Sequence, residues 1–234
     1  MKETDTIKNA VHLEGAVCSC VITHTPGKDT VIAQMEICTA SIQKNAGAAK
    51  LKNPVIHRAV AVASGENAAR LRALADETGG MRINLSEDLP KLKCVSVDGR
   101  LTKNDKAQPY VAVAEEGLAF PERLAFKNTA ILQGRVLETT YNDAYAGAVL
   151  QCEGEGGRQI LVPVNIYSKD NPRKYADLAS GKIRKGDILS VKGPLISGFY
   201  SNGEKEVYRC HVNINNYDNL SRKRTQQKTS SLGV

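Results

Sequence analysis

The chain contains the same sequence pattern twice. Residues 9–17 read Asn-Ala-Val-His-Leu-Glu-Gly-Ala-Val, and residues 128–136 read Asn-Thr-Ala-Ile-Leu-Gln-Gly-Arg-Val, with Asn, Leu, Gly and Val at matching positions. A second pair follows in the same order, Val-Ser-Val-Asp-Gly-Arg-Leu at 95–101 and Leu-Ser-Val-Lys-Gly-Pro-Leu at 189–195. Solenoid units are much shorter than the separation of these copies. The pattern therefore predicts two copies of one domain.

The length and composition fit this prediction. The 234 residues leave room for two domains of about 100 residues each. The sequence has no apolar run of about 18 residues, so we expect no membrane span. The first residues lack the apolar region of a signal peptide, so we expect a cytoplasmic protein.

The six cysteines lie mostly in apolar, strand-like runs, and no Cys-x-x-Cys or zinc-type spacing occurs. We therefore expect reduced, structural cysteines and no metal or other cofactor, with metal binding as the weaker alternative. The chain also has no phosphate-binding loop, no Gly-x-Ser-x-Gly and no His-Glu-x-x-His, so the sequence does not predict an enzyme.

The hydrophobic periodicity gives the same order of elements in both copies. The first copy predicts strands at 11–22, 30–39, 55–62, 93–101 and 110–114, a basic loop at 43–52, and a helix at 66–77 stopped by Gly79 and Gly80. The second copy predicts strands at 130–137, 148–152, 159–167, 187–195 and 206–214, and a helix at 172–179 that begins at Pro172. Five strands with one helix between the third and fourth is the order of an OB-fold barrel.

The predicted fold class is therefore all-β with one short helix per domain, built as two tandem five-stranded OB-fold barrels. We expect the first OB-fold domain at 1–120, the second at 121–220, and a flexible basic tail at 221–234. The two halves differ in charge. Residues 121–234 carry 17 Lys and Arg against 11 Asp and Glu, whereas residues 1–120 are almost neutral. A basic half favours a polyanionic partner, with nucleic acid before membrane.

The first copy resembles the bacterial single-stranded-DNA-binding proteins. The resemblance rests on Asn-x-Val-x-Leu-x-Gly at 9–15, Thr-Pro-Gly at 25–27, His-Arg-x-Val at 57–60 and Val-Asp-Gly-Arg-Leu at 97–101. The chain is also similar to the primosomal replication proteins, a related branch with one OB-fold. The resemblance implies binding of single-stranded DNA without sequence preference. It also implies assembly of four OB-folds, and hence a homodimer of this chain.

Two departures favour a specialised paralogue, such as one encoded by a phage or a mobile element. Members of the family carry a Trp before the His-Arg pair, where this chain has Ile56, and the chain contains no Trp. They also end in an acidic tail, whereas the last residues here are basic.

Single strands are held by aromatic rings that stack on bases and by a basic groove. Most aromatic residues lie in the second copy, so we expect the main binding surface there. Tyr141 and Tyr145 fall in the predicted loop between the first two strands, and Phe199 and Tyr200 in the loop between the last two. These are the loops with which OB-folds bind ligands. The candidate DNA-binding residues are Tyr141, Tyr145, Tyr167, Phe199, Tyr200, Arg135, Lys169, Arg173, Lys192, Lys205 and Arg209 in the second copy, and Arg58, Arg100 and Lys103 in the first.

Three functions remain open at this point. The first is sequence-independent binding of single-stranded DNA in replication, recombination or repair. The second is a replication or conjugation scaffold whose OB-folds bind protein, which the aromatic-poor first copy favours for that domain. The third function is binding of RNA, because stacking on bases alone does not distinguish RNA from DNA.

Overall fold

A computed structural model describes residues 9–25, 29–45, 48–79, 93–123, 125–201, 203 and 206–221, with only the backbone for 42–45 and 48–50. The predicted basic tail lies outside these residues, except for Ser221. The chain forms two compact units that interleave in the sequence. The N-terminal unit comprises the described residues of 11–128 and 197–209, and the C-terminal unit comprises those of 1–10, 129–196 and 210–234.

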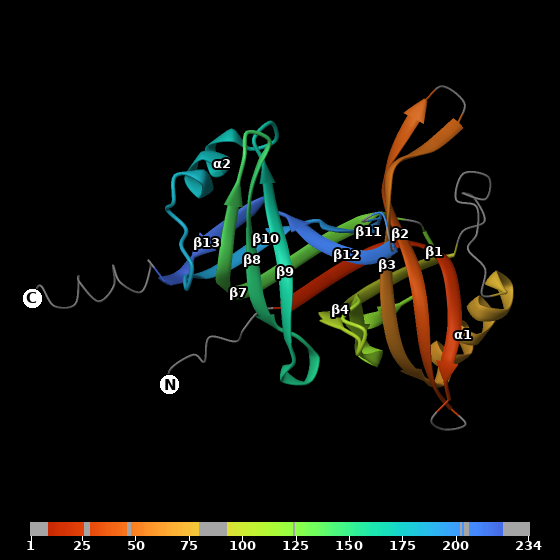
Figure 1. Ribbon diagram of the computed structural model, residues 1–234. Helices are drawn as coiled ribbons and strands as arrows, with labels where there is room; N and C mark the ends of the chain where they lie inside the picture. The colour runs from red at the N-terminus through yellow and green to blue at the C-terminus, as the bar shows by residue number, and fades with distance from the viewer. Residues whose placement is uncertain are drawn as a thin grey trace, which may run out of the picture. The chain divides into compact units, whose positions relative to one another are not determined.

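The N-terminal unit is built on a closed barrel (Figure 1). Its elements are β1 (Asn9–His24), β2 (Thr30–Asn45), β3 (Ala48–Ser64), α1 (Gly65–Thr78), β4 (Cys94–Lys103), β5 (Pro109–Val113) and the two-residue strand β6 (Leu118–Ala119). Strands β1, β2 and β3 pair antiparallel, β5 runs parallel to β3, and β4 pairs with both β5 and β1. The ring of pairings therefore closes on β1, as an OB-fold requires.

The elements of the second copy follow the same order. They are β7 (Lys127–Tyr141), β8 (Tyr145–Glu153), β9 (Gln159–Tyr167), α2 (Pro172–Ala179), β10 (Ile188–Gly193), β11 (Leu195–Ser201), β12 (Glu206–Asn213) and β13 (Asn216–Asn219). Strand β9 pairs with β8 antiparallel and with β12 in parallel, and β10 pairs antiparallel with β7. The pairings repeat those of the first copy, except that the two partners of β4 correspond to partners of two strands here, since β10 pairs with β7 and β11 pairs with β12.

Several predictions of local structure were wrong. Residues 43–52 do not form a loop, because the β2–β3 ladder continues to the pair Asn45 and Ala48. Continued strand pairing here outweighs the low strand preference of Lys and Asn, and the two strands project from the barrel as a long hairpin (Figure 1). The predicted strand 187–195 is divided, because Pro194 has no N–H to donate to a ladder. Strand β11 then continues to Ser201, beyond the predicted end.

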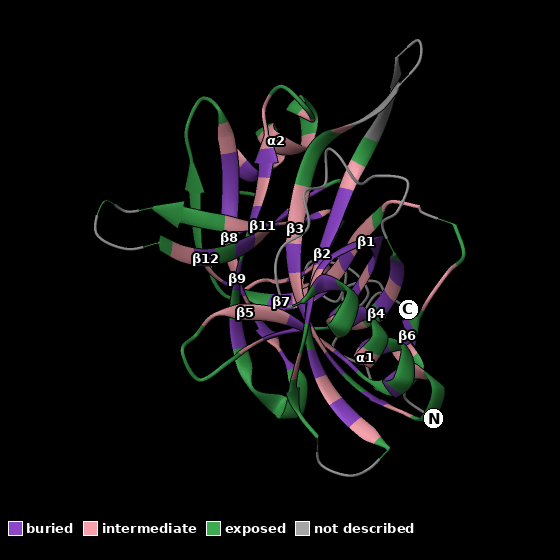
Figure 2. Cartoon of the chain, turned by 90° about the vertical axis from the view of Figure 1, so that its right-hand side faces the viewer, coloured by how far each residue is buried: buried purple, intermediate pink, exposed green. Residues whose placement is uncertain are grey.

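The core of each unit is lined by alternate residues of its strands. Figure 2 shows this alternation as buried and less buried bands along β2 and β3. The repeated glycines of the first and fourth strands lie where neighbouring strands approach closely. A Cβ at Gly15 would collide with the carbonyl oxygen of Cys38, and one at Gly193 with that of Asn213. All six cysteines are buried free thiols, and burial raises the pKa of Cys152 and of Cys210 to about 12.

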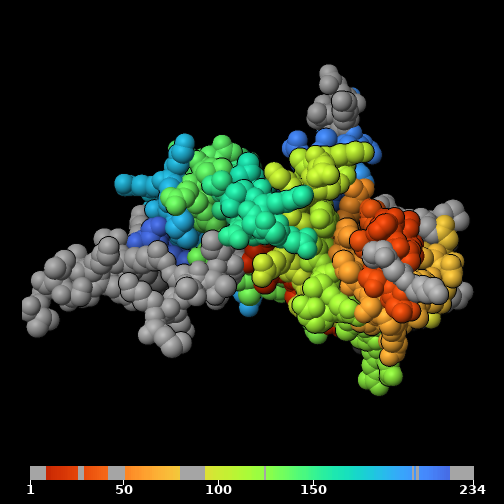
Figure 3. Space-filling view, turned by 90° about the horizontal axis from the view of Figure 1, so that it is seen from below, coloured from red at the N-terminus to blue at the C-terminus, as the bar shows by residue number. Residues whose placement is uncertain are grey.

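Helix α1 packs on the N-terminal barrel through Ala68, Leu71 and Leu74. Thr78 accepts a hydrogen bond from the backbone N–H of Cys20 (3.3 Å), which fixes the end of the helix to β1. Gly79 ends the helix in the left-handed conformation (φ 56°), which a glycine adopts at little cost. Figure 3 shows α1 (yellow) at the surface near β1 (red to orange). No helix among the described residues is long and apolar enough to cross a membrane.

Candidate nucleic-acid interface

Arg58 is the centre of an aromatic cluster in the N-terminal unit. Its guanidinium carbon lies 4.5 Å from the ring centroid of Tyr208 and 5.0 Å from that of Phe199. The two rings meet edge to face, with centroids 5.4 Å apart and planes at 66°. Strand β3 supplies Arg58 from the first copy, whereas β11 and β12 supply the rings from the second. The aromatic-poor first copy therefore obtains aromatic rings from the 197–209 segment of the second.

Hydrogen bonds to the backbone of β3 hold the Arg58 cluster in place. The Tyr208 hydroxyl accepts from the backbone N–H of Arg58 (3.0 Å) and donates to the carbonyl of Ile56 (3.2 Å). Tyr208 is buried, and the side chain of Arg58 is only 20% exposed. Glu36 on β2 faces the guanidinium, with its carboxylate 3.9 Å from Nε. The cation is therefore held in one place rather than free to sample the solvent.

His57 joins the 197–209 segment to the barrel. Its Nε2 lies 2.8 Å from the Thr39 hydroxyl and 3.3 Å from Nδ2 of Asn128, and its Nδ1 lies 3.0 Å from the Ser197 hydroxyl. Since the Asn128 amide nitrogen can only donate, Nε2 accepts and Nδ1–H donates to Ser197. The imidazole is fully buried, and this desolvation lowers its pKa to about 3. His57 is therefore a neutral structural link at the start of this segment.

A concave site adjoins the Arg58 cluster. It has a volume of about 230 Å³ and lies between the outer face of β2 and β3 and the turn from β4 to β5. Its walls are Arg58, Gln34, Val60, Asn104, Gln108, Pro109 and Tyr110. The outer face of the second and third strands, together with the loop between the fourth and fifth, is where OB-folds bind oligonucleotides.

The C-terminal unit carries a second set of aromatic residues. Tyr145 and Tyr167 are opposite each other on β8 and β9, with ring centroids 6.2 Å apart and planes at 54°. Tyr141, at the end of β7, is the most exposed large apolar side chain in the described part of the chain, at 69%. Its strand ends at a turn in which Asn142 Oδ1 accepts from the N–H groups of Ala144 and Tyr145.

Basic residues accompany these rings. Lys169 is exposed in the turn after Tyr167, and Arg173 is exposed at the start of α2. Figure 1 shows α2 beside the tip of the β7–β8 hairpin. The Tyr175 hydroxyl donates to the Asn142 carbonyl (2.8 Å), which ties the helix to that tip. Arg135 and Lys192 are also exposed, on β7 and β10.

The predicted residues thus divide between the two units. Phe199, Tyr200, Arg209, Arg58, Arg100 and Lys103 belong to the N-terminal unit, and the other described candidates to the C-terminal unit. Lys205 lies outside the described residues. The four loop aromatics are on strands, because the ladders extend beyond their predicted ends: Tyr141 and Tyr145 flank the β7–β8 turn, and Phe199 and Tyr200 are on β11. Sequence reasoning missed Tyr208 and Gln108 as parts of the site, and no linear signal pairs them with Arg58.

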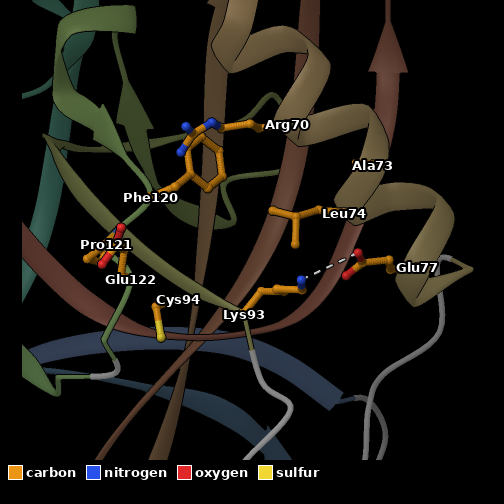
Figure 4. A pocket seen from close by; sticks show the side chains of 9 residues that line it. All are labelled: Arg70, Ala73, Leu74, Glu77, Lys93, Cys94, Phe120, Pro121 and Glu122. Carbon is orange, nitrogen blue, oxygen red and sulfur yellow. Dashed lines mark ion pairs between the residues drawn. The ribbon is translucent and has the colours of Figure 1, made fainter.

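A larger concave site of about 460 Å³ lies between α1 and residues 120–122 (Figure 4). Its floor contains Leu74, Phe120 and Cys94. The two cations on its rim already have partners, since Arg70 bonds to Glu66 (2.6 Å) and Lys93 pairs with Glu77 (3.6 Å). Carboxylates of α1 therefore partly neutralise both cations of this rim.

The geometry of both units defines the class of the protein as a chain of two OB-folds. No protein-family model matches the chain, and no curated protein sequence matches it. Among solved structures, the chain is similar to the wild-type single-stranded DNA binding protein from Thermus aquaticus. The identity is 21% and the TM-score 0.58, over 91% of this chain and 93% of that one.

A deletion variant of the same Thermus aquaticus protein gives 19% identity and a TM-score of 0.56, over 91% of this chain and 94% of that one. The dimeric N-terminal domain of PriB from Thermoanaerobacter tencongensis covers 40% of this chain at 15% identity and a TM-score of 0.28, with 96% of that domain matched. The strand pairings and the likeness to the two Thermus aquaticus structures confirm the predicted fold class, all-β with two tandem OB-folds.

Proposed function

We propose that this protein binds single-stranded DNA without a strict sequence requirement, in replication, recombination or repair. The observation that carries the proposal is the exposure of three aromatic rings. Tyr141, Phe199 and Tyr200 are 69%, 46% and 43% exposed, although burial of such rings would normally stabilise a core. An exposed ring can instead stack on a base of a bound strand, and each stacked base contributes about 1–3 kcal/mol to binding.

Each unit contributes its own surface to this proposal. In the N-terminal unit, Phe199 lies against Arg58, so a stacked base would meet a fixed cation. In the C-terminal unit, Tyr141 and the Tyr145–Tyr167 pair stand near Lys169 and Arg173, which offer charges to phosphates. The name of the Thermus aquaticus protein supports the same ligand. The proposed function requires no catalytic group. We also propose that the protein acts in the cytoplasm, where bacterial chromosomal and plasmid DNA lie.

The alternative is a scaffold that binds protein through its OB-folds. Exposed aliphatic side chains on the sheet faces favour it, namely Val21 and Val62 in the N-terminal unit and Leu161 in the C-terminal unit. In that case the basic residues after Ser221 would account for any attraction to DNA. Truncation after Ser221 separates the two functions. We expect the truncated protein to keep a preference for single strands over duplex, whereas loss of all DNA binding would favour the scaffold.

We further propose that the chain forms a homodimer, which brings four OB-folds together. The resemblance to the single-stranded-DNA-binding proteins supports this state. Light scattering coupled to size exclusion should give twice the chain mass of 25.3 kDa, and a monomer would contradict the proposal. A competition titration with an RNA oligonucleotide of equal length tests the choice of nucleic acid.

A further inference from the structure

The concave site beside Arg58 has a wall whose hydrogen-bonding groups are fixed. Oε1 of Gln108 accepts from Nη1 of Arg58 and from Nδ2 of Asn104, each at 3.4 Å. These two donors use the oxygen of the amide and set its orientation. The Nε2 group of Gln108 is therefore the part of this amide that remains available to a ligand.

The turn that presents Gln108 is itself tied down. Oδ1 of Asn104 accepts from the N–H groups of Lys106 (3.0 Å) and Gln108 (2.9 Å), and the backbone N–H of Asn104 donates to the Gln108 carbonyl (3.0 Å). The acceptor of Asn104 is thus already occupied. The part of the lining made by Arg58, Asn104 and Gln108 therefore offers donors rather than acceptors, whereas Gln34, which also lines the site, carries both.

The Nε of Arg58 lies behind this wall rather than in it. It is buried and has no hydrogen-bond partner among the described residues, because the carboxylate of Glu36 is 3.9 Å away, so a ligand in the site would meet the terminal nitrogens of the guanidinium. The site is smaller than the usual 300–1,000 Å³ of a small-molecule pocket, and Val60, Pro109 and Tyr110 give it apolar or aromatic surface. These dimensions and surfaces suit one planar base rather than a whole nucleotide cofactor.

A wall of donors distinguishes between the bases. Guanine presents two adjacent acceptors, O6 and N7, and paired donors of an arginine are their commonest partners. Adenine presents an acceptor beside a donor, and thymine alternates acceptors with a donor. Each of these bases would therefore place one of its own N–H donors against an N–H donor of the wall. We propose that this site is a base-selective subsite that accepts a single unstacked guanine from a bound strand. The inference rests on the proposed function and adds a preference for one base to it.

The test compares oligo-dT of about 16 nucleotides, the upper end of the site size of one OB-fold, with the same strand carrying one central guanine or one central adenine. Affinities are measured by fluorescence polarisation with the full chain. Because a good bidentate contact discriminates by about 1–3 kcal/mol, we expect the guanine strand to bind at least about 5-fold more tightly than the other two.

Two variants locate the preference. Gln108→Leu removes the donor, and Gln108→Glu keeps the shape but replaces the donor with an acceptor. Both should bring the guanine-to-thymine affinity ratio to about one while leaving tyrosine circular dichroism unchanged. Gln159→Leu is the matched control, an exposed glutamine of the C-terminal unit that should retain the preference.

Each result has a distinct meaning. A guanine preference that both Gln108 variants lose supports the subsite. Equal affinity for all three strands overturns the subsite and leaves single-strand binding intact. An adenine preference, or a guanine preference that survives in both variants, also overturns it. If none of the strands binds, the proposed function itself fails.

Discussion

Arg58 combines a charge with a fixed position. Phe199 and Tyr208 cover it, Gln108 accepts from it, and the Tyr208 hydroxyl holds its backbone. Cation–π contacts contribute about 0.5–2 kcal/mol, more when the groups are shielded from water. An arginine held this way loses little entropy when it binds a phosphate or a base. The residue is therefore better suited to recognition than the exposed Arg100 or the half-buried Lys103.

At the residue scale, Phe199→Leu should weaken the binding of single-stranded DNA. The variant keeps apolar bulk but loses the ring that stacks, so we expect a loss of about 1–3 kcal/mol, or about 5- to 150-fold in Kd. The measurement is polarisation with labelled oligo-dT. Phe120→Leu is the control, since Phe120 also contacts an arginine, Arg70 at 5.6 Å, but outside the proposed site. An equal effect of both variants would contradict the assignment.

The buried imidazole of His57 should make stability depend on pH. Its pKa falls from 6.5 to about 3 on folding, so between these values the unfolded chain binds more protons. Stability must therefore decrease as the pH falls through this range, by at most about 1.4 kcal/mol per pH unit. His57→Gln should reduce the slope of the free energy of unfolding against pH between pH 6 and 4, measured by urea denaturation.

The exposed His24 offers the control for that experiment, because His24→Gln should retain the pH dependence of the parent chain. All other titrating groups are the same in the three proteins, so the differences between slopes isolate the histidines. If His57→Gln and the parent lose stability equally on acidification, the ring is not held neutral in the fold.

At the scale of elements, the β11–β12 segment 197–209 is the least expected part of the structure. Tyr208→Phe removes both hydrogen bonds of the hydroxyl and leaves the Ile56 carbonyl and the Arg58 N–H without that partner. Such a loss costs about 1–3 kcal/mol. We expect this loss in urea denaturation, together with faster amide exchange in residues 206–209. Unchanged exchange there would show that the segment is held by other contacts.

Helix α2 begins with a side-chain cap that can be tested by itself. Asn171 Oδ1 accepts from the backbone N–H of Lys174 (3.2 Å), and Pro172 occupies the first position of the helix. Asn171→Ala should therefore destabilise the fold by about 1 kcal/mol, whereas Asn171→Asp should change it little. Thermal denaturation followed by circular dichroism measures both. A large loss in the Asp variant would contradict a capping role.

The sequence predicted the presence of most strands and helices more accurately than their ends or the segments that they contact. Alternation predicted the main strands of both copies but not β6, β11 or β13. The span of α2 was correct, because Pro172 and the apolar period mark a helix locally. Strand ends were less accurate, since the continuation of strand structure beyond Thr39 or Leu195 depends on pairing with the neighbouring strand. The contact of Phe199 with Arg58 could not be predicted, because it joins residues of different copies and has no signal in the hydrophobic periodicity.

At the scale of the whole molecule, duplication allows the two copies to specialise. The first copy retains the His57-Arg58 motif and few aromatic residues, and the second supplies rings both to its own unit and to the N-terminal unit. Most of the excess of positive charge in residues 121–234 comes from Arg222, Lys223, Arg224 and Lys228 at the C-terminal end, which strengthens the attraction of this half of the chain to phosphates. We therefore expect both units to contribute to one binding event, with the C-terminal unit providing more of its salt dependence.

The most direct test of this account is polarisation of labelled oligo-dT of about 30 nucleotides, titrated at low and high salt beside a duplex of equal length. Each phosphate contact on a single strand adds about −0.7 to the slope of log K against log salt. We predict that the single strand stays bound at high salt through stacking, while the duplex dissociates. Equal affinity for both, abolished by salt, would contradict single-strand recognition.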